Sequence, residues 1–453
     1  MARYRDDELD VVFERIDNNR KHESSADYED YTVDVDKVYE KEKKNRRDNH
    51  KKKKKKRRRK ITLLIAEIIV IAILSFILVM LIMPNSKQWF LGTTVGKFFV
   101  GLFIDEEDYS NVFDDRFDNQ NIGVNSDLDT SAMDGYMNIA LFGLDSRDDE
   151  LETGVNSDSI IIMSINEKTG DVKLVSVYRD TFLRVNNTNG SYSYNKINSA
   201  YCLGGAQQTV KTLNQNLDLN ISAYVSINFA GLADIIDALG GIEINISQNE
   251  MYEINNYLTE TREVTGKYAP DVTSYGNVRL TGLQAVAFCR IRKVQFVDED
   301  GTVYAEDYGR TARQRRVIMK IVDLAKNAGV SKVLDVANEI FYGEEKVIYT
   351  SIPYDDIIDM IPTLMGFSIS DSTGYPFSYD GTRDKVYLSD GTFVDWPIAI
   401  QGLSYNNYKL HEFLFGNTKY KPSETVKTIN DNLIMLTQIE EKRLDGDEDV
   451  DLD

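Results

Sequence analysis

The chain has 453 residues and a formal net charge of −20, which is unevenly distributed along the sequence. Residues 1–60 hold 21 Lys/Arg against 15 Asp/Glu, whereas the residues after 83 hold 32 against 57. The strongly acidic charge of the C-terminal part excludes general binding to nucleic acid. Any anion that this part recognises must therefore be bound by a local group of cations.

Cysteine and histidine are scarce, which excludes further classes of protein. Two cysteines, Cys202 and Cys289, cannot form a disulfide framework; one bridge stays open, and two small buried thiols are the expectation. Of the three histidines, His411 alone follows residue 60. A zinc site built on paired histidines and a Ser-His-Asp catalytic triad are therefore both disfavoured.

The apolar run Ile61–Met83 directly follows a stretch in which every residue from Lys51 to Lys60 is Lys or Arg. As a helix this run would be about 34 Å long, enough to cross a hydrocarbon core of roughly 30 Å. The basic residues predict a cytoplasmic N-terminus and a C-terminal part outside the cell. We therefore expect a single-pass protein of the cell membrane, with a disordered cytoplasmic tail over residues 1–60.

Other interpretations of this region are weaker. A cleaved signal peptide is disfavoured because the apolar run is too long, starts after sixty residues and ends without a small-x-small site. The basic run could bind nucleic acid or act as an address, but attraction to anionic lipid already accounts for it. Glu67 is expected to snorkel or to take a proton rather than to pair two helices.

Short apolar runs alternate with helical periodicity after residue 136, which predicts an α/β domain with a layered sheet. The expected strands are 137–142, 159–165, 172–177, 224–228 and 242–246, and the expected helices are 206–217, 230–239 and 311–327. We place an extracellular connecting segment at 84–135, the domain at 136–330, a C-terminal extension packed on or following it at 331–439, and an acidic tail at 440–453.

Charged residues gather where the predicted strands end. Asp145 follows the first strand, and Asp158 precedes the second. A strand leaving one loop and a strand entering from the other place both carboxylates at one edge of the sheet. Oxygen ligands without histidine favour Mg²⁺, with Mn²⁺ as the alternative.

Cations and one amide accompany the later strands and the last helix. They are Arg179, Lys196, Arg290, Arg292, Arg310, Arg313 and Gln314. Guanidinium groups bind phosphate oxygens bidentately and keep their charge. So many cations without matching acids indicate a shared anionic ligand, and a metal with fixed cations is the equipment of phosphoryl transfer.

The joint pattern resembles the LytR-CpsA-Psr family of cell-wall glycopolymer transferases. Those proteins carry an N-terminal anchor, G-x-D-x-R after a strand, S-D before the next, R-D-T at the third strand's end, K-I-N-x-A-Y at a helix start, and R-x-R followed by D-x-G-R-x-x-R-Q. The corresponding segments here are 143–147, 157–158, 179–181, 196–201, 290–292 and 307–314. The resemblance covers residues 137–326 in the same order and approximate spacing.

The resemblance implies a layered α-β-α domain with a central mixed sheet. It implies a transferase that moves an undecaprenyl-pyrophosphate-linked polymer, such as a teichoic acid or a capsular or secondary wall polysaccharide, onto peptidoglycan and releases undecaprenyl phosphate. Asp145 and Asp158 would reach the pyrophosphate through Mg²⁺. The pyrophosphate would bind Arg147, Arg179, Lys196, Arg290, Arg292, Arg310, Arg313 and Gln314.

The expected catalytic residues are Arg179, Asp180 and Arg313. For Asp180, a role as orienting group or base competes with a salt bridge to Arg179. The chain departs from the family pattern twice: Tyr178 stands where proline usually precedes R-D-T, and an insert over residues 293–306 separates the two arginine groups.

Three alternatives stay open. A pyrophosphatase would use the same residues with water as the acceptor. A membrane regulator would act through the N-terminal tail, which has no legible helix-turn-helix. A non-catalytic binder of lipid pyrophosphate is the third.

Overall fold

A computed structural model of the chain describes residues 112–145, 151–342, 346–354, 356–357, 360 and 366–443. The expected tail, the transmembrane span 61–83, most of the connecting segment, Arg147 and most of the acidic tail lie outside these residues. Within the described ranges, no helix is both long and apolar enough to cross a membrane.

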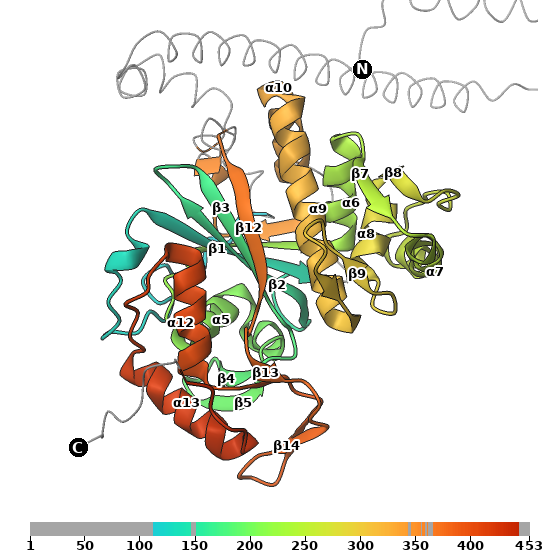
Figure 1. The fold of residues 1–453 in the computed structure, drawn as a ribbon. Helices are drawn as coiled ribbons and strands as arrows, with labels where there is room; N and C mark the ends of the chain where they lie inside the picture. Colours follow the sequence, from blue (N-terminus) through green and yellow to red (C-terminus); the bar gives the residue numbers. More distant parts are fainter. Residues whose placement is uncertain are drawn as a thin grey trace, which may run out of the picture. The chain divides into compact units, whose positions relative to one another are not determined.

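A six-stranded mixed sheet forms the centre of the fold (Figure 1). Its strands, in spatial order, are β11 (Ile348–Thr350), β6 (Ala223–Asn228), β1 (Tyr136–Leu144), β2 (Ser157–Asn166), β3 (Asp171–Val177) and β12 (Ser368–Tyr375). Strands β1, β2 and β3 form an antiparallel meander, while β6 runs parallel to β1 and β12 runs parallel to β3. The fold is therefore mixed α/β, as expected.

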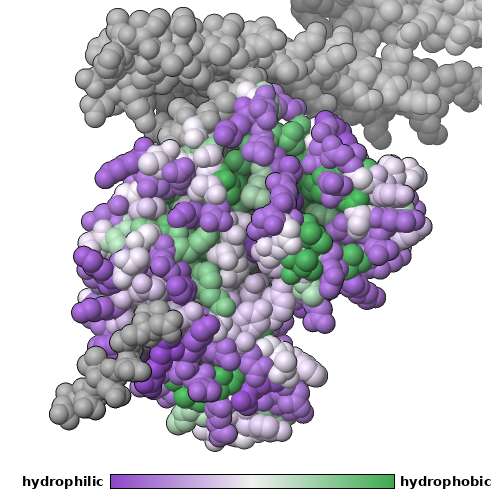
Figure 2. Space-filling model, viewed as in Figure 1, coloured by the Kyte–Doolittle hydropathy of each residue, from purple (hydrophilic) through white to green (hydrophobic). Residues whose placement is uncertain are grey.

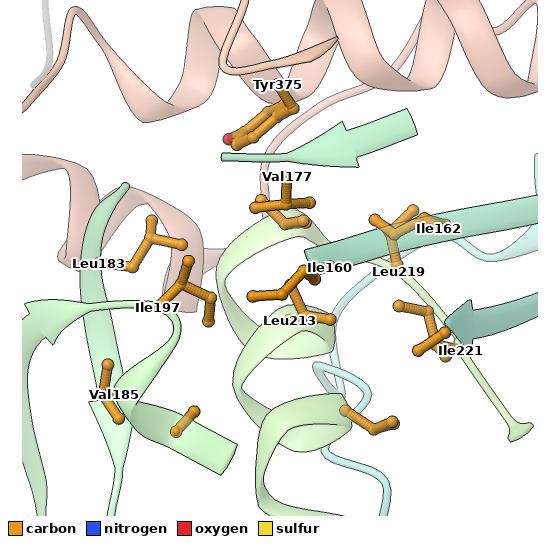
Figure 3. Packing of buried hydrophobic residues seen from close by; sticks show 14 of the residues in the cluster. Ile160, Ile162, Val177, Leu183, Val185, Ile197, Leu213, Leu219, Ile221 and Tyr375 are labelled. Carbon is orange, nitrogen blue, oxygen red and sulfur yellow. The ribbon is translucent and has the colours of Figure 1, made fainter. Parts of the chain in front are cut away.

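Helices cover both faces of this sheet, which explains why its strands read as nearly continuous apolar runs. On one face, Phe142 and Ile160 pack against Leu213 of α5 (Ser199–Leu217), in the cluster whose packing Figure 3 shows. On the other face, Leu174 packs with Met319 of α9 (Glu306–Ala328). The α-β-α layering follows from this two-sided burial.

A second hydrophobic core lies beside the sheet and contains most of the segment between β6 and α9. Its elements are α6 (Phe229–Ala238), β7 (Ile242–Ile246), α7 (Gln248–Thr265), β8 (Gly276–Leu280), α8 (Gly282–Arg290), β9 (Phe296–Val297) and β10 (Val303–Tyr304), with α10 (Val330–Tyr342) adjoining α6 and α9. The predicted strand 242–246 is confirmed, but it pairs with β8 outside the central sheet.

The remaining elements pack on the same side of the sheet as α5. They are the short helix η1 (Ser131–Met133), the hairpin β4 (Phe182–Asn186) and β5 (Tyr192–Lys196), the strands β13 (Tyr379–Asp380), β14 (Lys385–Tyr387), β15 (Phe393–Asp395) and β16 (Ala399–Ile400), and the helices α12 (Leu403–Phe415) and α13 (Glu424–Thr437). Residues 331–439 thus supply both edge strands of the sheet as well as part of the main core.

The other predicted helices and strands are also present, with shifted ends. Helix α5 starts at Ser199 rather than at 206 and is interrupted at Gly204 and Gly205. Gly205 has φ +64°, and a Cβ there would lie 2.2 Å from the carbonyl oxygen of Glu152, so glycine is required at this bend. Helix α9 starts five residues earlier than predicted, at Glu306.

Candidate functional site

The sheet brings several predicted site residues to one edge. Because β2 runs opposite to β1 and β3, the ends of β1 and β3 lie beside the start of β2. Leu144 pairs with Ser157, so Asp145 follows this pair at the end of β1, and Asp158 is the unpaired residue at the register shift between Ser157 and Ser159. Arg179 follows the end of β3 at the same edge. The strand pattern had predicted this juxtaposition.

A tight turn presents Arg179 and Asp180. The backbone N–H of Thr181 donates to the carbonyl of Tyr178 at 2.9 Å, and the Thr181 hydroxyl donates to the same oxygen at 2.6 Å. The Arg179 carbonyl accepts from the N–H of Asn198 at 3.1 Å. The threonine therefore closes the turn and fixes the two charged residues at its corners.

Arg179 lies among three carboxylates. Its Nη1 donates to Oδ1 of Asp158 at 2.7 Å, and its Nε lies 3.5 Å from Oδ2 of Asp180 and 4.0 Å from Oδ2 of Asp307. Burial alone lowers the pKa of the Arg179 guanidinium, but the three carboxylates outweigh it and the net shift is upward. Arg179 is therefore held charged and in place.

The first turn of α9 and the segment after α8 complete the group. Arg310, which is 3% exposed, places Nε 2.8 Å from Oδ1 of Asp307 and Nη1 3.8 Å from Oδ2 of Asp158. Arg292 reaches Oδ1 of Asp307 with its Nε at 3.5 Å. Asp307 sits in the first turn of the helix, where its charge also interacts favourably with the helix dipole.

Lys196 joins this group from the end of β5. Its Nζ lies 3.0 Å from Oδ1 of Asp180. We call the seven residues connected by these contacts the edge cluster. They are Asp158, Arg179, Asp180, Lys196, Arg292, Asp307 and Arg310.

The edge cluster has four cations for three carboxylates, so its formal charge favours an added anion. The pKa of Arg292 is lowered, first by burial and then by Arg310 and Arg179, and Asp307 compensates this only in part. The Nε atoms of Arg179 and Arg310 are buried and make no hydrogen bond of good geometry despite their nearby carboxylates. Donors in this state suit the oxygens of a phosphate.

Asp307 is the residue that sequence reasoning undervalued. It appeared only as part of a motif, and the arginines were expected to converge without matching acids. The structure corrects this, because Asp307 lies within 4.0 Å of three of the arginines and Asp158 within 3.8 Å of two. The spacing of Asp307 and Arg310, one helical turn apart, was the available signal.

Arg313, which we expected as a catalytic and pyrophosphate-binding residue, lies apart from the edge cluster in the structure. It is fully buried in the second core, where Nη2 lies 2.8 Å from Oε1 of Glu250. Its nitrogens also donate to the carbonyls of Ile291, Val294 and Gln295. With these partners, Arg313 fixes the start of the insert to α7 and α9.

Arg290 also points elsewhere. Its Nη1 donates to the Thr261 hydroxyl at 3.0 Å, its Nη2 lies 2.9 Å from Glu260, and its guanidinium stacks over Phe229. Gln314 lies one turn beyond Arg310 on α9, with a buried Oε1 that has no hydrogen-bond partner. Arg147 lies outside the described residues.

The carboxylates at the edge of the sheet can be compared with the needs of a metal site. Among the described residues, no three acidic, histidine or cysteine side chains gather closely enough to hold a metal ion by themselves. Magnesium needs no such cage, because it is usually bound by one or two carboxylates together with water and substrate phosphates. Asp145, which is exposed, and Asp158 fit that lighter requirement, although Asp158 also binds Arg179.

The fold and the edge cluster define a class, an α/β protein that gathers arginine and aspartate side chains at one end of its central strands. The chain belongs to the LytR_cpsA_psr family, whose model matches residues 106–380.

Similar proteins share part of the chain. A polyisoprenyl-teichoic acid--peptidoglycan teichoic acid transferase TagU of Bacillus cereus is 31% identical over 224 residues, which are 49% of this chain and 63% of that protein. Biofilm regulatory protein A of Streptococcus mutans is 28% identical over 310 residues, 65% of this chain and 72% of that protein. The chain thus spans less than two thirds of the TagU relative.

Solved structures resemble the fold. Protein gbs0355 from Streptococcus agalactiae has a TM-score of 0.47 at 23% identity and covers 65% of this chain and 92% of its own. The structure named as TagT bound to LI-WTA has a TM-score of 0.45 at 21% identity and covers 65% of this chain and 98% of its own.

Proposed function

We propose that this protein transfers a polyprenyl-pyrophosphate-linked glycopolymer, of the teichoic acid, capsular or secondary wall polysaccharide class, onto peptidoglycan. The edge cluster carries the proposal, because four cations meet at one sheet edge and two buried arginine donors there lack hydrogen bonds. The name of the TagU relative, which is 31% identical, supports the same activity.

The proposed reaction needs charge neutralisation more than covalent chemistry. A hydroxyl of the acceptor attacks the sugar-side phosphorus, the bond between that phosphorus and the bridging oxygen breaks, and polyprenyl phosphate leaves as a phosphodiester forms. Arg179, Arg292 and Arg310 would bind the pyrophosphate oxygens and stabilise the charge that develops on the leaving phosphate.

Asp180 is the proposed acceptor of the hydroxyl proton or the group that orients the hydroxyl. Its Oδ1 lies 3.0 Å from Lys196 and its Oδ2 lies 3.5 Å from Arg179. These two contacts hold the carboxylate in place, so positioning of the hydroxyl is its first proposed role. A base must be within hydrogen-bond reach of the proton that it accepts.

Magnesium, bound through Asp145 and Asp158, would neutralise further charge on the pyrophosphate. Asp145 gives the cleaner test, since Asp158 also binds Arg179. With full-length protein in detergent, Asp145→Ala and a chelator should each abolish formation of the phosphodiester product, and added Mg²⁺ should restore the chelated wild type only. Full activity in the chelator would remove the metal from the mechanism.

The membrane placement belongs to the same proposal. The basic run before Ile61 predicts a cytoplasmic N-terminus, so the edge cluster would face the cell wall, where the acceptor is. The transfer assay should use a polyprenyl-pyrophosphate-linked donor and isolated peptidoglycan, with both the phosphodiester and free glycopolymer measured. Glycopolymer attached to peptidoglycan supports transfer, whereas release into water alone would identify a pyrophosphatase.

A further inference from the structure

The segment after β13 carries exposed aromatic side chains. Strands β14 and β15 form a hairpin in which Val386 pairs with Val394, and Tyr387 pairs with Phe393. Successive residues of a strand face opposite sides. Accordingly, Val386 and Val394 are buried in the main core, while Tyr387 and Phe393 are 65% and 46% exposed.

A third exposed aromatic residue, Trp396, directly follows β15. It is 64% exposed and has φ +47°, which is an unfavourable backbone conformation for a large side chain. Its N–H donates to the carbonyl of Asp384 at 2.7 Å, which holds it against the start of the hairpin. An exposed tryptophan kept in a strained conformation by its surroundings indicates a function rather than a core role. We call Tyr387, Phe393 and Trp396 the aromatic platform.

The backbone connects the aromatic platform to the edge cluster. Two residues after Trp396, the N–H of Ile398 donates to the carbonyl of Asp180 at 2.8 Å, and the carbonyl of Ile398 accepts from the N–H of Phe182 at 2.9 Å. Chain 396–398 therefore runs alongside the turn that presents Asp180. Trp396 is thus two residues from the point at which the chain bonds to the residue proposed to position the attacking hydroxyl.

The chemistry of the surroundings selects the partner. Residues 383–396 hold two cations against three carboxylates, so the hairpin is weakly acidic. Attachment to anionic lipid needs a basic surface, and an anionic polymer would be repelled. Figure 2 shows that this face of the domain is mostly hydrophilic, with hydrophobic residues in small separate patches rather than one broad area suited to membrane insertion.

We propose that the aromatic platform binds the sugar rings of the acceptor glycan strand and so delivers its hydroxyl to Asp180. Flat aromatic faces match the apolar C–H faces of pyranose rings, and the phenol and indole groups supply hydrogen bonds. Lys385, whose Nζ lies 4.3 Å from the Phe393 ring centroid, and Asp395 opposite it add polar partners for sugar hydroxyls. This inference rests on the proposed transfer and names its acceptor side.

The two tryptophans of the chain make a direct test practical. In full-length protein in detergent, with Trp89→Phe to leave Trp396 as the sole reporter, soluble oligosaccharides of β-1,4-linked N-acetylhexosamines should shift and quench the fluorescence. Vesicles of anionic lipid should not. A response to vesicles but not to sugars would overturn the proposal in favour of a membrane contact.

Variants separate this inference from the proposed function. Trp396→Gly removes the ring and tolerates φ +47°, and Tyr387→Ala provides a second variant; the control is Tyr275→Ala, which alters an equally exposed tyrosine outside the hairpin. We expect the first two to raise the KM for peptidoglycan at least tenfold with binding of a short-chain polyprenyl pyrophosphate unchanged. Unchanged KM values with an inactive Arg179→Ala would reject the platform and leave the transfer proposal standing.

Discussion

Arginine side chains serve two purposes in this protein, and their partners distinguish them. Arg292 and Arg179 contact carboxylates at a solvent-accessible edge of the sheet. Burial is the largest cause of the lowered pKa of Arg292, and the neighbouring cations lower it further. Arg313 is fully buried, bound by one glutamate and three carbonyls. The first group holds more cations than carboxylates, whereas the guanidinium of Arg313 already has a carboxylate and three carbonyls as partners.

The contrast predicts opposite outcomes for two alanine substitutions. Arg292→Ala should lower turnover by on the order of 10²-fold with little change in melting temperature, because a donor to the developing charge is lost. Arg313→Ala should cost about 3–5 kcal/mol of unfolding free energy, because Glu250 is left buried without its partner. Melting temperature and turnover, measured on the same preparations of each variant, distinguish a role in ligand binding from a role in folding. A stable, inactive Arg313→Ala would return that residue to the site.

His411 gives a prediction for stability against pH. Burial lowers its pKa from 6.5 to about 4, although Leu217 and Asp218 partly oppose the shift. Between pH 6.5 and pH 4, His411 therefore binds a proton in the unfolded chain but not in the folded chain. The stability that the neutral side chain contributes is complete above pH 6.5 and falls as the pH drops toward 4. Between pH 6.5 and 4.5 this loss should be about 2 kcal/mol.

The measurement is urea unfolding of wild type and His411→Gln at both pH values. Glutamine can still donate to the Leu217 carbonyl, which lies 3.1 Å from Nε2 of His411. The variant should lose less stability over this interval than the wild type. Equal losses would show that His411 is not the titrating group.

At the scale of elements, Tyr178 shows how the chain accommodates a departure from the family pattern. Its N–H donates to the carbonyl of Tyr375 at 3.0 Å, a bond that proline could not make, and its ring contacts Tyr308 at 4.7 Å between centroids. The ring lies over β12, where a Cβ on Gly374 would be 2.0 Å from the Tyr178 hydroxyl. Tyr178 thus connects β3, β12 and the first turn of α9.

This packing predicts a strong coupling between two positions. Gly374→Ala should destabilise the wild type by about 1–3 kcal/mol through overpacking, and much less in a Tyr178→Ala background, where the opposing ring is gone. A double-mutant cycle by chemical denaturation measures the coupling. If the two substitutions were additive, β3 and β12 would accommodate the added methyl group without strain, and the contact between residues 178 and 374 would contribute little to stability.

Sequence patterns found the elements whose residues alternate or repeat clearly, and missed those whose identity depends on distant partners. The strands β1, β2 and β3 are apolar on both faces and were predicted within a few residues. Strand β12, Ser368–Tyr375, is largely polar and exists because β3 offers it an unpaired edge. Its sequence pattern is typical of a loop, so this edge strand could not be predicted from the sequence.

The same reason explains which of the predicted site residues lie together in the structure. Arg179 comes just after the end of β3 and Asp158 lies at the start of β2, so strand direction alone places both at the same end of the sheet. Arg310 and Arg313 are three residues apart on α9, yet one reaches the edge cluster and the other reaches Glu250, 63 residues earlier in the chain. Periodicity cannot separate them, because both faces of this helix turn are buried.

At the scale of the whole molecule, the sheet is built from segments far apart in the sequence. Strands β11 and β12 lie after residue 330, and Leu410 and Ile429 of the last two helices share a core with β1 and α5. A protein ending at residue 330 should therefore lose its near-ultraviolet circular dichroism and its cooperative melt, whereas one ending at 443 should keep both. A cooperative melt in the shorter protein would show that these segments are accessory.

The proposed role of the edge cluster as the binding site for a pyrophosphate is tested most directly by the affinity for that ligand. Calorimetric titration of full-length protein in detergent with a short-chain polyprenyl pyrophosphate should show at least 100-fold weaker binding for Arg179→Ala and partial recovery for Arg179→Lys, whose ammonium lacks the bidentate fork. Arg262→Ala, which removes an arginine of α7 that pairs with Asp271, should bind like the wild type. Wild-type affinity in Arg179→Ala would contradict the assignment of this site.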